Sequence, residues 1–324
     1  MTTESIERSG SKIHQDAQDA LNMLVAAGYM KSPTSDHAQN AFLQAMGMVD
    51  GSQSEVVLPV SLASDGCSSS TSDQSPEWPK DRVAFSPESG HIIVLNLGST
   101  RLHRGWKAEY DSVFDKLPEL EVLNLGGSDL PAKDTVSILK RLPKLKTLLV
   151  GGNGLGKHGI SIVGEWFRLS GSTALEKLDV RYNDLGSDGM EVLCQNLPPS
   201  LELLYLEGNE IDDEGAIMLA RSLTDPECQL REIFLGANNI GPRGAQALAK
   251  ALITNRQLTK LYLEGNCIGA EGAMAFAEVL ETFEGEPTLR HLFVDNNQIG
   301  KEVSKRLAAA LNSPTQIGDS LGEE

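Results

Sequence analysis

The chain has 324 residues with 45 acidic and 28 basic side chains, which gives a formal net charge of −17. A charge this negative argues against a nucleic-acid binder, which needs a basic face to neutralise phosphate, and against docking on anionic lipid. No apolar run approaches the ~20 residues that span a bilayer. The length corresponds to about two domains or to one long repeat array.

The N-terminal sequence MTTESIERSGSK is acidic and polar, whereas a signal peptide begins with basic and then apolar residues. The four cysteines are widely spaced and form neither a C-x-x-C pair nor a disulfide framework. Both features predict a protein of the cytoplasm, with the nucleus as the alternative.

Residues 1–50 predict two short amphipathic helices, because apolar residues between 13 and 25, and again between 38 and 46, fall on one helical face. Two such helices bury too little surface to fold alone, so we expect them to pack together, on the rest of the chain or on a partner. Residues 51–80 are rich in Ser, Asp, Gly and Pro, which is typical of a disordered linker. The whole leader is therefore expected to be mostly disordered or loosely helical.

From residue 92 onward the pattern L-x-x-L-x-L-x-x-N-x-I/L occurs eight times, with starts 25 to 31 residues apart. The two leucines of L-x-L face the same side of a strand, because side chains alternate along strands. Small and apolar residues then follow at i, i+1, i+4, i+5 and i+8, which is one face of a helix. Each unit therefore predicts a strand, a turn and a helix. The units start at Ile92, Leu120, Leu145, Leu175, Leu201, Leu230, Leu258 and Leu289.

The Asn of the pattern lies where the chain leaves the strand. Its amide can bond backbone groups that neighbouring units leave unpaired there. Thr100 and Ser128 occupy this position in the first two units, as is normal near the end of an array. We expect a structural ladder formed by Asn153, Asn183, Asn209, Asn238, Asn266 and Asn297.

A repeat array exposes its core at both ends and needs caps. The segment from Arg82 to Phe85, a turn, and the segment from Ile92 read as a hairpin, whose first strand we expect beside the first unit. A helix from Lys301 to Leu311 is expected at the other end. The array with its caps would span residues 81–311, followed by a disordered tail at 312–324.

The ~28-residue period and the phrase LEGNEIDDEGAIMLARSL at residues 206–223 resemble the ribonuclease-inhibitor-like class of leucine-rich repeat proteins. The resemblance implies an α/β fold, a leucine-rich repeat solenoid with about eight repeats in a right-handed parallel β/α horseshoe. The class includes ribonuclease inhibitor, Ran GTPase-activating protein, tropomodulin and the sensor arrays of NOD-like receptors. These proteins share the binding of another protein and differ in what that binding does.

Gly154–Gly159 reads GLGKHG, a G-x-G-x-x-G motif, and Asp179 follows 20 residues later, as in a dinucleotide site. The stretch is also a P-loop without its final Ser/Thr. Gly159 nevertheless occupies the same repeat position as Gly189, and a leucine-rich repeat is itself a βαβ unit. We therefore interpret the motif as part of the repeat and predict no cofactor.

Ser320 lies in a G-x-S-x-G spacing, but only two residues follow Gly322, so the helix of a nucleophile elbow has no room. The six histidines form no i, i+4 pair, which argues against a metal site. Cys194 occupies the small-residue position of its helix and is expected to be a core thiol. The sequence thus predicts no catalytic and no metal-binding residues.

The residue between the paired leucines faces the concave side of the predicted horseshoe, and it is aromatic in the last four units. With strands about 4.8 Å apart, these rings would form one row bordered mainly by acids. Aromatic anchors with a charged rim are typical of protein interfaces, and an acidic rim favours a basic partner. The predicted contact residues are Tyr205, Phe234, Tyr262, Phe293, Glu207, Glu232, Glu264, Asp295, Arg181 and Asp179.

A simpler explanation of the row is also open. Residues 204–209 and 261–266 are identical (LYLEGN), so duplication could have copied ring and acid together. Aromatic residues also suit strands generally. Glycines at 98, 126, 127, 151 and 152 leave the first half of the predicted face bare, which favours the second half as the binding surface.

The sequence therefore predicts a non-enzymatic interaction module or scaffold that binds a protein with a basic surface. The first alternative is a GTPase-activating regulator resembling Ran GTPase-activating protein and acting on a small GTPase. No residue can be assigned its chemistry, and the acidic tail of that family is reduced to Glu323 and Glu324. The second alternative is an intracellular sensor-type repeat protein, although no nucleotide-binding domain precedes the array.

Overall fold

In the computed structural model, the described residues are 15–26, 83–86, 89–99, 102, 108–170, 174–283 and 287–311. The second leader helix, the linker at 51–80 and the tail at 312–324, which includes Ser320, lie outside these residues. Predictions about those segments stay predictions.

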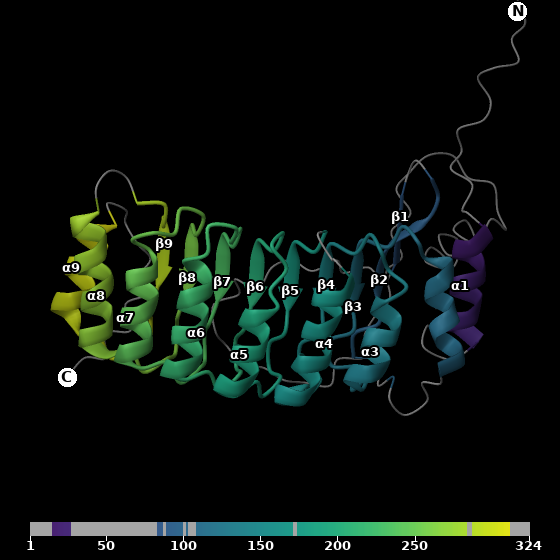
Figure 1. Cartoon of the computed structure of the whole chain (residues 1–324), viewed down its shortest axis with the longest axis horizontal. Coiled ribbons are helices and arrows are strands. Elements are labelled where there is room, and N and C mark those ends of the chain that lie inside the picture. Colours follow the sequence, from purple (N-terminus) through teal and green to yellow (C-terminus); the bar gives the residue numbers. More distant parts are fainter. Residues whose placement is uncertain are drawn as a thin grey trace, which may run out of the picture.

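The described strands form one nine-stranded sheet in the order of the sequence (Figure 1). β1 (Val83–Phe85) pairs antiparallel with β2 (Ile92–Asn96), and each later neighbour pair is parallel. The sheet therefore grows by one strand per repeat. The other strands are β3 (Val122–Asn124), β4 (Thr147–Leu149), β5 (Lys177–Asp179), β6 (Leu203–Tyr205), β7 (Glu232–Phe234), β8 (Lys260–Tyr262) and β9 (His291–Phe293).

The helices line up side by side in a second layer along the sheet (Figure 1). The first unit carries a 3-10 helix, η2, where the later units carry α-helices. The two layers confirm the predicted α/β leucine-rich repeat solenoid. The helices are α1 (Gln15–Ala26), η2 (Ala108–Lys116), α3 (Ala132–Leu139), α4 (Gly156–Ser170), α5 (Gly186–Gln195), α6 (Asp213–Leu223), α7 (Pro242–Ala251), α8 (Gly269–Thr282) and α9 (Lys301–Ala310).

The core is a stack of equivalent side chains between the two layers. Leu178 of β5 is in register with Leu204 of β6, which is in register with Ile233 of β7, and all three are 0% exposed. Small residues bring each helix close to this stack. A Cβ at Gly215 of α6 would lie 2.8 Å from the Ile211 side chain, so only glycine fits where this helix begins.

The Asn ladder ties neighbouring units together. Asn209 Nδ2 donates to the carbonyls of Leu206 in its own unit (2.9 Å) and Val180 in the preceding unit (3.0 Å). Its Oδ1 accepts the backbone N–H of Asn183 at 2.9 Å. Each ladder amide spans two units in this way; those at the other positions are Asn153, Asn183, Asn238, Asn266 and Asn297.

Helices pack at both described ends of the array. The apolar face of α1 packs on η2 and buries Leu21 and Leu24 completely, while Lys116 Nζ lies 3.2 Å from Asp19 Oδ2. At the other end, α9 packs on α8, and Arg306 Nη2 lies 2.7 Å from Glu281 Oε2. The first leader helix thus packs on the rest of the chain, one of the three arrangements expected from the sequence.

We expect Asn209→Ala to lower the free energy of unfolding by about 3 kcal/mol, because one buried N–H loses its acceptor and two buried carbonyls each lose one of their two amide donors. Asn239→Ala is the matched control, since Asn239 is exposed and none of the described hydrogen bonds involves its side chain. It should stay within about 0.5 kcal/mol of the unchanged protein. Urea unfolding followed by circular dichroism measures both; equal midpoints would show that the ladder does not stabilise the fold.

Thiol reactivity gives a second test of the packing. Burial raises the pKa of the Cys194 thiol to about 12, although the residue as a whole is only half-buried, whereas Cys267 is exposed. Because the thiolate is the reactive form, iodoacetamide at neutral pH should alkylate Cys267 quickly and Cys194 only after denaturation. Peptide mass mapping with and without urea distinguishes them, and equal native rates would contradict the enclosed position.

Candidate functional site

The face of the sheet opposite the helices, called the open face here, carries a stack of four rings. Tyr205 and Phe234 have ring centroids 4.5 Å apart, Phe234 and Tyr262 4.1 Å, and Tyr262 and Phe293 4.5 Å. The angles between the ring planes fall from 19° to 9° to 6° along the row. In-register parallel strands place the rings face to face, so they form one continuous aromatic row.

The four rings of the row differ in exposure. Tyr205 is 1% exposed and Phe234 is 9% exposed, whereas Tyr262 and Phe293 are half-buried. Phe234 has a ring on each side, and the Arg181 guanidinium lies over the terminal Tyr205 ring, 5.4 Å from its centroid. Tyr205 and Phe234 therefore expose little of the row. A partner can reach the row through Tyr262 and Phe293.

Asp179, Arg181 and Glu207 form a charged group at the start of the row. Two nitrogens of Arg181 contact the two carboxylate oxygens of Asp179 at 3.1 and 2.9 Å, and a third lies 3.6 Å from Glu207 Oε1. Asp179 is 5% exposed and also accepts the Arg181 backbone N–H. Asp179 and Arg181 thus hold each other in place, which leaves Asp179 little surface for the predicted partner contact.

A second ion pair borders the other side of the row. Lys260 Nζ lies 2.9 Å from Glu232 Oε1, which links β8 to β7. His291 of β9 is exposed and lies 6.2 Å from the Phe293 ring. This border therefore carries both signs of charge, and the Glu232 carboxylate predicted to meet a partner is already paired.

The remaining acids of the face, Glu207, Glu264 and Asp295, lie two residues after the ring positions. Burial raises the pKa of both Glu207 and Glu264 to about 7. Arg181 opposes this shift at Glu207, while Asp295 adds to the shift at Glu264. Both carboxyls are consequently part protonated at neutral pH, so the negative charge of this border depends on pH.

The first units of the open face are built differently. Asn96 Oδ1 accepts the Gly98 N–H at 3.0 Å, and Asn124 Oδ1 accepts the Gly126 N–H at 2.8 Å. Both amides are thus bent onto their own backbone. Leu149, in the equivalent position of β4, is 3% exposed. The equivalent position carries an aromatic ring in β6 to β9.

The G-x-G-x-x-G stretch is engaged inside the array. The N–H groups of Gly156 and Leu155 donate to the Asn183 backbone oxygen and amide oxygen at 2.8 and 3.2 Å. Lys157 Nζ pairs with Asp188 at 2.8 Å. The groups that would cradle a phosphate are bonded within the repeat, as the repeat interpretation requires.

One exposed aromatic residue was not singled out from the sequence. Tyr182 is 60% exposed and adopts φ 52°, a left-handed conformation that is uncommon for a bulky side chain. Its ring lies against Gly208, where an added Cβ would be 2.3 Å from a ring carbon. The sequence does contain a sign of this unusual residue. Tyr182 stands at the repeat position that is glycine in other units, at Gly152, Gly208 and Gly265.

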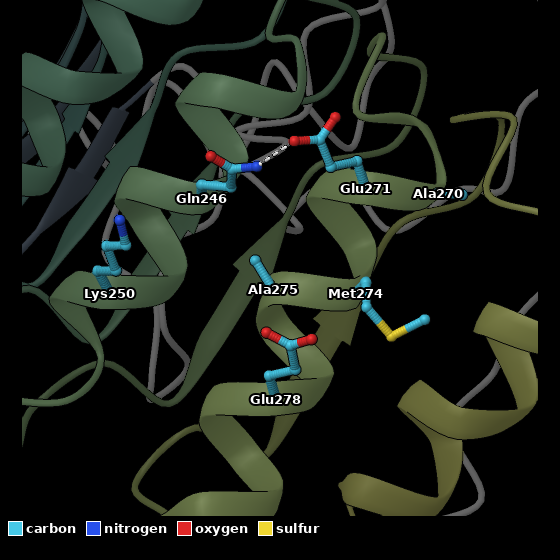
Figure 2. A pocket seen from close by; sticks show the side chains of 7 residues that line it. All are labelled: Gln246, Lys250, Ala270, Glu271, Met274, Ala275 and Glu278. Carbon is cyan, nitrogen blue, oxygen red and sulfur yellow. Dashed lines mark hydrogen bonds between the residues drawn. The ribbon is translucent and has the colours of Figure 1, made fainter.

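A hollow of about 440 Å³ lies between α7 and α8 on the helical side (Figure 2). In Figure 2, Gln246 and Glu271 are joined across it by a hydrogen bond of 2.8 Å, with Met274 at its edge. Its mixed lining of short apolar and charged side chains resembles ordinary helix surface more than a site built for one ligand.

No described group of three or more His, Cys, Asp or Glu side chains is placed to hold a metal ion. Among the described helices, none combines the length and apolar character required to cross a membrane.

The described part of the chain is a strand–helix solenoid. It is defined by parallel in-register strands, one Asn ladder and one layer of helices. A family model described as Leucine Rich repeat matches residues 171–194, 198–220, 229–249 and 254–277. Pig (Sus scrofa) ribonuclease inhibitor is 29% identical over 145 residues, which are 44% of this chain and 32% of the inhibitor. Mouse (Mus musculus) ribonuclease inhibitor is 31% identical over 185 residues, 55% of this chain and 40% of the inhibitor.

The chain is a leucine-rich repeat protein of the ribonuclease-inhibitor-like class. It spans less than half the length of these two relatives. Among solved structures, the leucine-rich repeat-containing protein LegL7 from Legionella pneumophila is 22% identical with a TM-score of 0.48. That match covers 67% of this chain and 71% of LegL7.

The raised pKa of Glu264 has a consequence for stability. The folded protein holds this proton up to about pH 7, whereas the ordinary pKa is 4.5. The folded state therefore binds more protons than the unfolded state between these values, and stability falls as pH rises from 4.5 to 7. We expect Glu264→Gln to remove part of this fall, so that the variant gains on the order of 2 kcal/mol over the unchanged protein between pH 5 and pH 8.

Urea unfolding at a series of pH values measures this gain. Glu278→Gln, an exposed position on α8, removes the same charge from the helical side and serves as the control. A stability difference that is the same at pH 5 and pH 8 for Glu264→Gln would contradict the assigned burial.

Proposed function

We propose that the chain is a non-enzymatic interaction module or scaffold that binds a protein partner on the open face, the concave face of the horseshoe. The observation that carries the proposal is the aromatic row with two half-exposed rings, Tyr262 and Phe293, beside carboxyl groups. Such rings supply large contact area at low conformational cost and are enriched where protein interfaces gain most of their energy.

The chemistry of the border favours a partner with a basic surface. Glu264 and Asp295 lie beside the exposed rings, and the whole chain carries a net charge of −17. Opposite charge on a partner would speed the encounter and orient it on the face. The names of the curated relatives describe inhibition of a ribonuclease; binding of a protein by this chain is the corresponding proposal.

We further propose that this binding takes place in the cytoplasm. The widely spaced cysteines, which form no C-x-x-C pair, support that compartment. A tagged full-length chain examined by fractionation tests it, and recovery with secreted or membrane fractions would contradict it.

The test of the binding surface is the double change Tyr262→Ala with Phe293→Ala. Both rings are half-buried at the accessible end of the row, so their loss should weaken partner capture by about tenfold or more, as at interface hot spots. Tyr205 and Phe234 are left intact because their removal from the packed stack would damage the fold.

Affinity capture followed by quantitative mass spectrometry provides the readout. Ile253→Ala is the control, since Ile253 is a 51% exposed apolar residue that follows α7 on the helical layer. An unchanged set of captured proteins for the folded double variant, checked by circular dichroism, would exclude the open face as the binding surface.

A further inference from the structure

The first unit of the array is covered by a helix from a distant part of the chain. α1 (Gln15–Ala26) stands at the end of the row of helices, beside η2 (Ala108–Lys116) (Figure 1). The connection between α1 and β1 is 56 residues long (27–82), whereas the connection between β9 and α9 at the other end has seven residues (294–300). Packing on η2, and not a short connection, therefore holds α1 in its place.

The apolar part of this contact comes from one face of each helix. η2 contributes Val113 and Phe114, which are 1% and 0% exposed and belong to the same buried cluster as the apolar residues of α1. Those of α1 follow the spacing i, i+3, i+4 and i+7 of one helical face, and each is 0% exposed: Ala17, Ala20, Leu21 and Leu24.

The polar part of the contact has opposite charges on the two helices. Lys116 Nζ of η2 lies 3.2 Å from Asp19 Oδ2 and 3.8 Å from Asp16 Oδ1 of α1. All three side chains are partly exposed, so these pairs add little to affinity. Their effect is to select the orientation in which α1 lies along η2.

The size of the contact makes the docking of α1 reversible. A helix of 12 residues such as α1 is marginal by itself in water, so α1 forms as it docks. Four buried apolar side chains, two of them alanines, must offset the ordering of the whole segment. η2 is a nine-residue 3-10 helix, longer than such helices usually are, and its hydrogen-bond geometry is weaker than that of the α-helices in later units.

We propose that the surface of η2 is a binding site for an amphipathic helix and that α1 occupies it reversibly within its own chain. While α1 is docked, the site is closed to any other helix, so α1 acts as an autoinhibitory segment. Helices from η2 onward lie on the side of the sheet opposite the open face, and the η2 site therefore uses none of the residues that carry the proposed function.

The experiment uses the full-length protein and a fluorescein-labelled peptide of residues 15–26 as the probe, with fluorescence anisotropy as the readout. Covalent attachment gives α1 an effective concentration on the order of 1 mM, so it stays docked in most molecules only if the dissociation constant is about 0.1 mM or lower. The unchanged protein should bind the peptide at least about tenfold more weakly than this, because its own α1 already occupies the site.

The double change Leu21→Asp with Leu24→Asp in the full-length protein opens the site. It places charges in the apolar face of α1, so the peptide should bind this variant with a dissociation constant of about 0.1 mM or lower. Asn22→Asp is the matched control, since it adds a charge to the exposed side of the same helix. Peptide binding to this control should stay as weak as binding to the unchanged protein.

Three results would overturn the proposal. The first is no binding of the peptide to the folded double variant at about 0.5 mM protein, which would exclude a site on η2. The second is equal binding to the double variant and to the unchanged protein, which would exclude occupation by α1. The third is a dimer of the unchanged protein at micromolar concentration that the double variant loses, seen by light scattering, which would assign α1 to a second copy.

Lys116→Glu replaces the double variant if circular dichroism shows that the double variant is unfolded. It leaves both leucines in place and sets a like charge opposite Asp16 and Asp19. A peptide of residues 15–26 with Asp16→Lys and Asp19→Lys should bind Lys116→Glu at least about threefold more tightly than it binds the unchanged protein. Equal affinities would overturn the docking of α1 on η2.

Discussion

The Asn ladder is the constraint on which the other features of this solenoid depend. Each ladder amide bonds the carbonyl of its own strand end and that of the preceding unit, as Asn238 does with Leu235 and Leu206. These carbonyls are buried, so a shifted unit would leave them unpaired. The ladder therefore fixes how far each unit advances. Strand register follows from it, since Leu204 can pair with Ile233 only at that advance.

Because the register is fixed, each position of the repeat lies next to the same position of the neighbouring units. Repetition of leucine in the inner positions builds a core, and repetition of aromatic residues in an outer position builds a stack. The stack and the Arg181 side chain over its first ring together leave Tyr205 almost no exposed surface on a face without helices. The charged border experiences the same effect, because carboxyls placed beside packed rings lose water and become weaker acids.

The sequence predicted well where each strand and helix of a unit lies, because every unit must bury its leucines and pair its backbone groups in the same way. The inner leucines, the ladder amides and the parallel strands all follow from periodicity. Properties that depend on contacts with other units were harder to predict from the sequence. The covering of Tyr205 by Arg181, the 3-10 helix η2 and the left-handed Tyr182 arise from contacts between units or from a local departure from the pattern. The sequence pattern predicts which side chains face outward, but the exposed area of each depends on the size of the side chains beside it in neighbouring units.

Stability and recognition make opposite demands on the border of the row. Asp179 and Glu232 are paired within the protein, so their charges add to the cohesion of the sheet. Glu207 and Glu264 converge beside a glycine, and their burial opposes ionisation without an equally close basic partner. Folding alone would favour neutral residues at 207 and 264, because burial opposes the ionised form of both carboxyls.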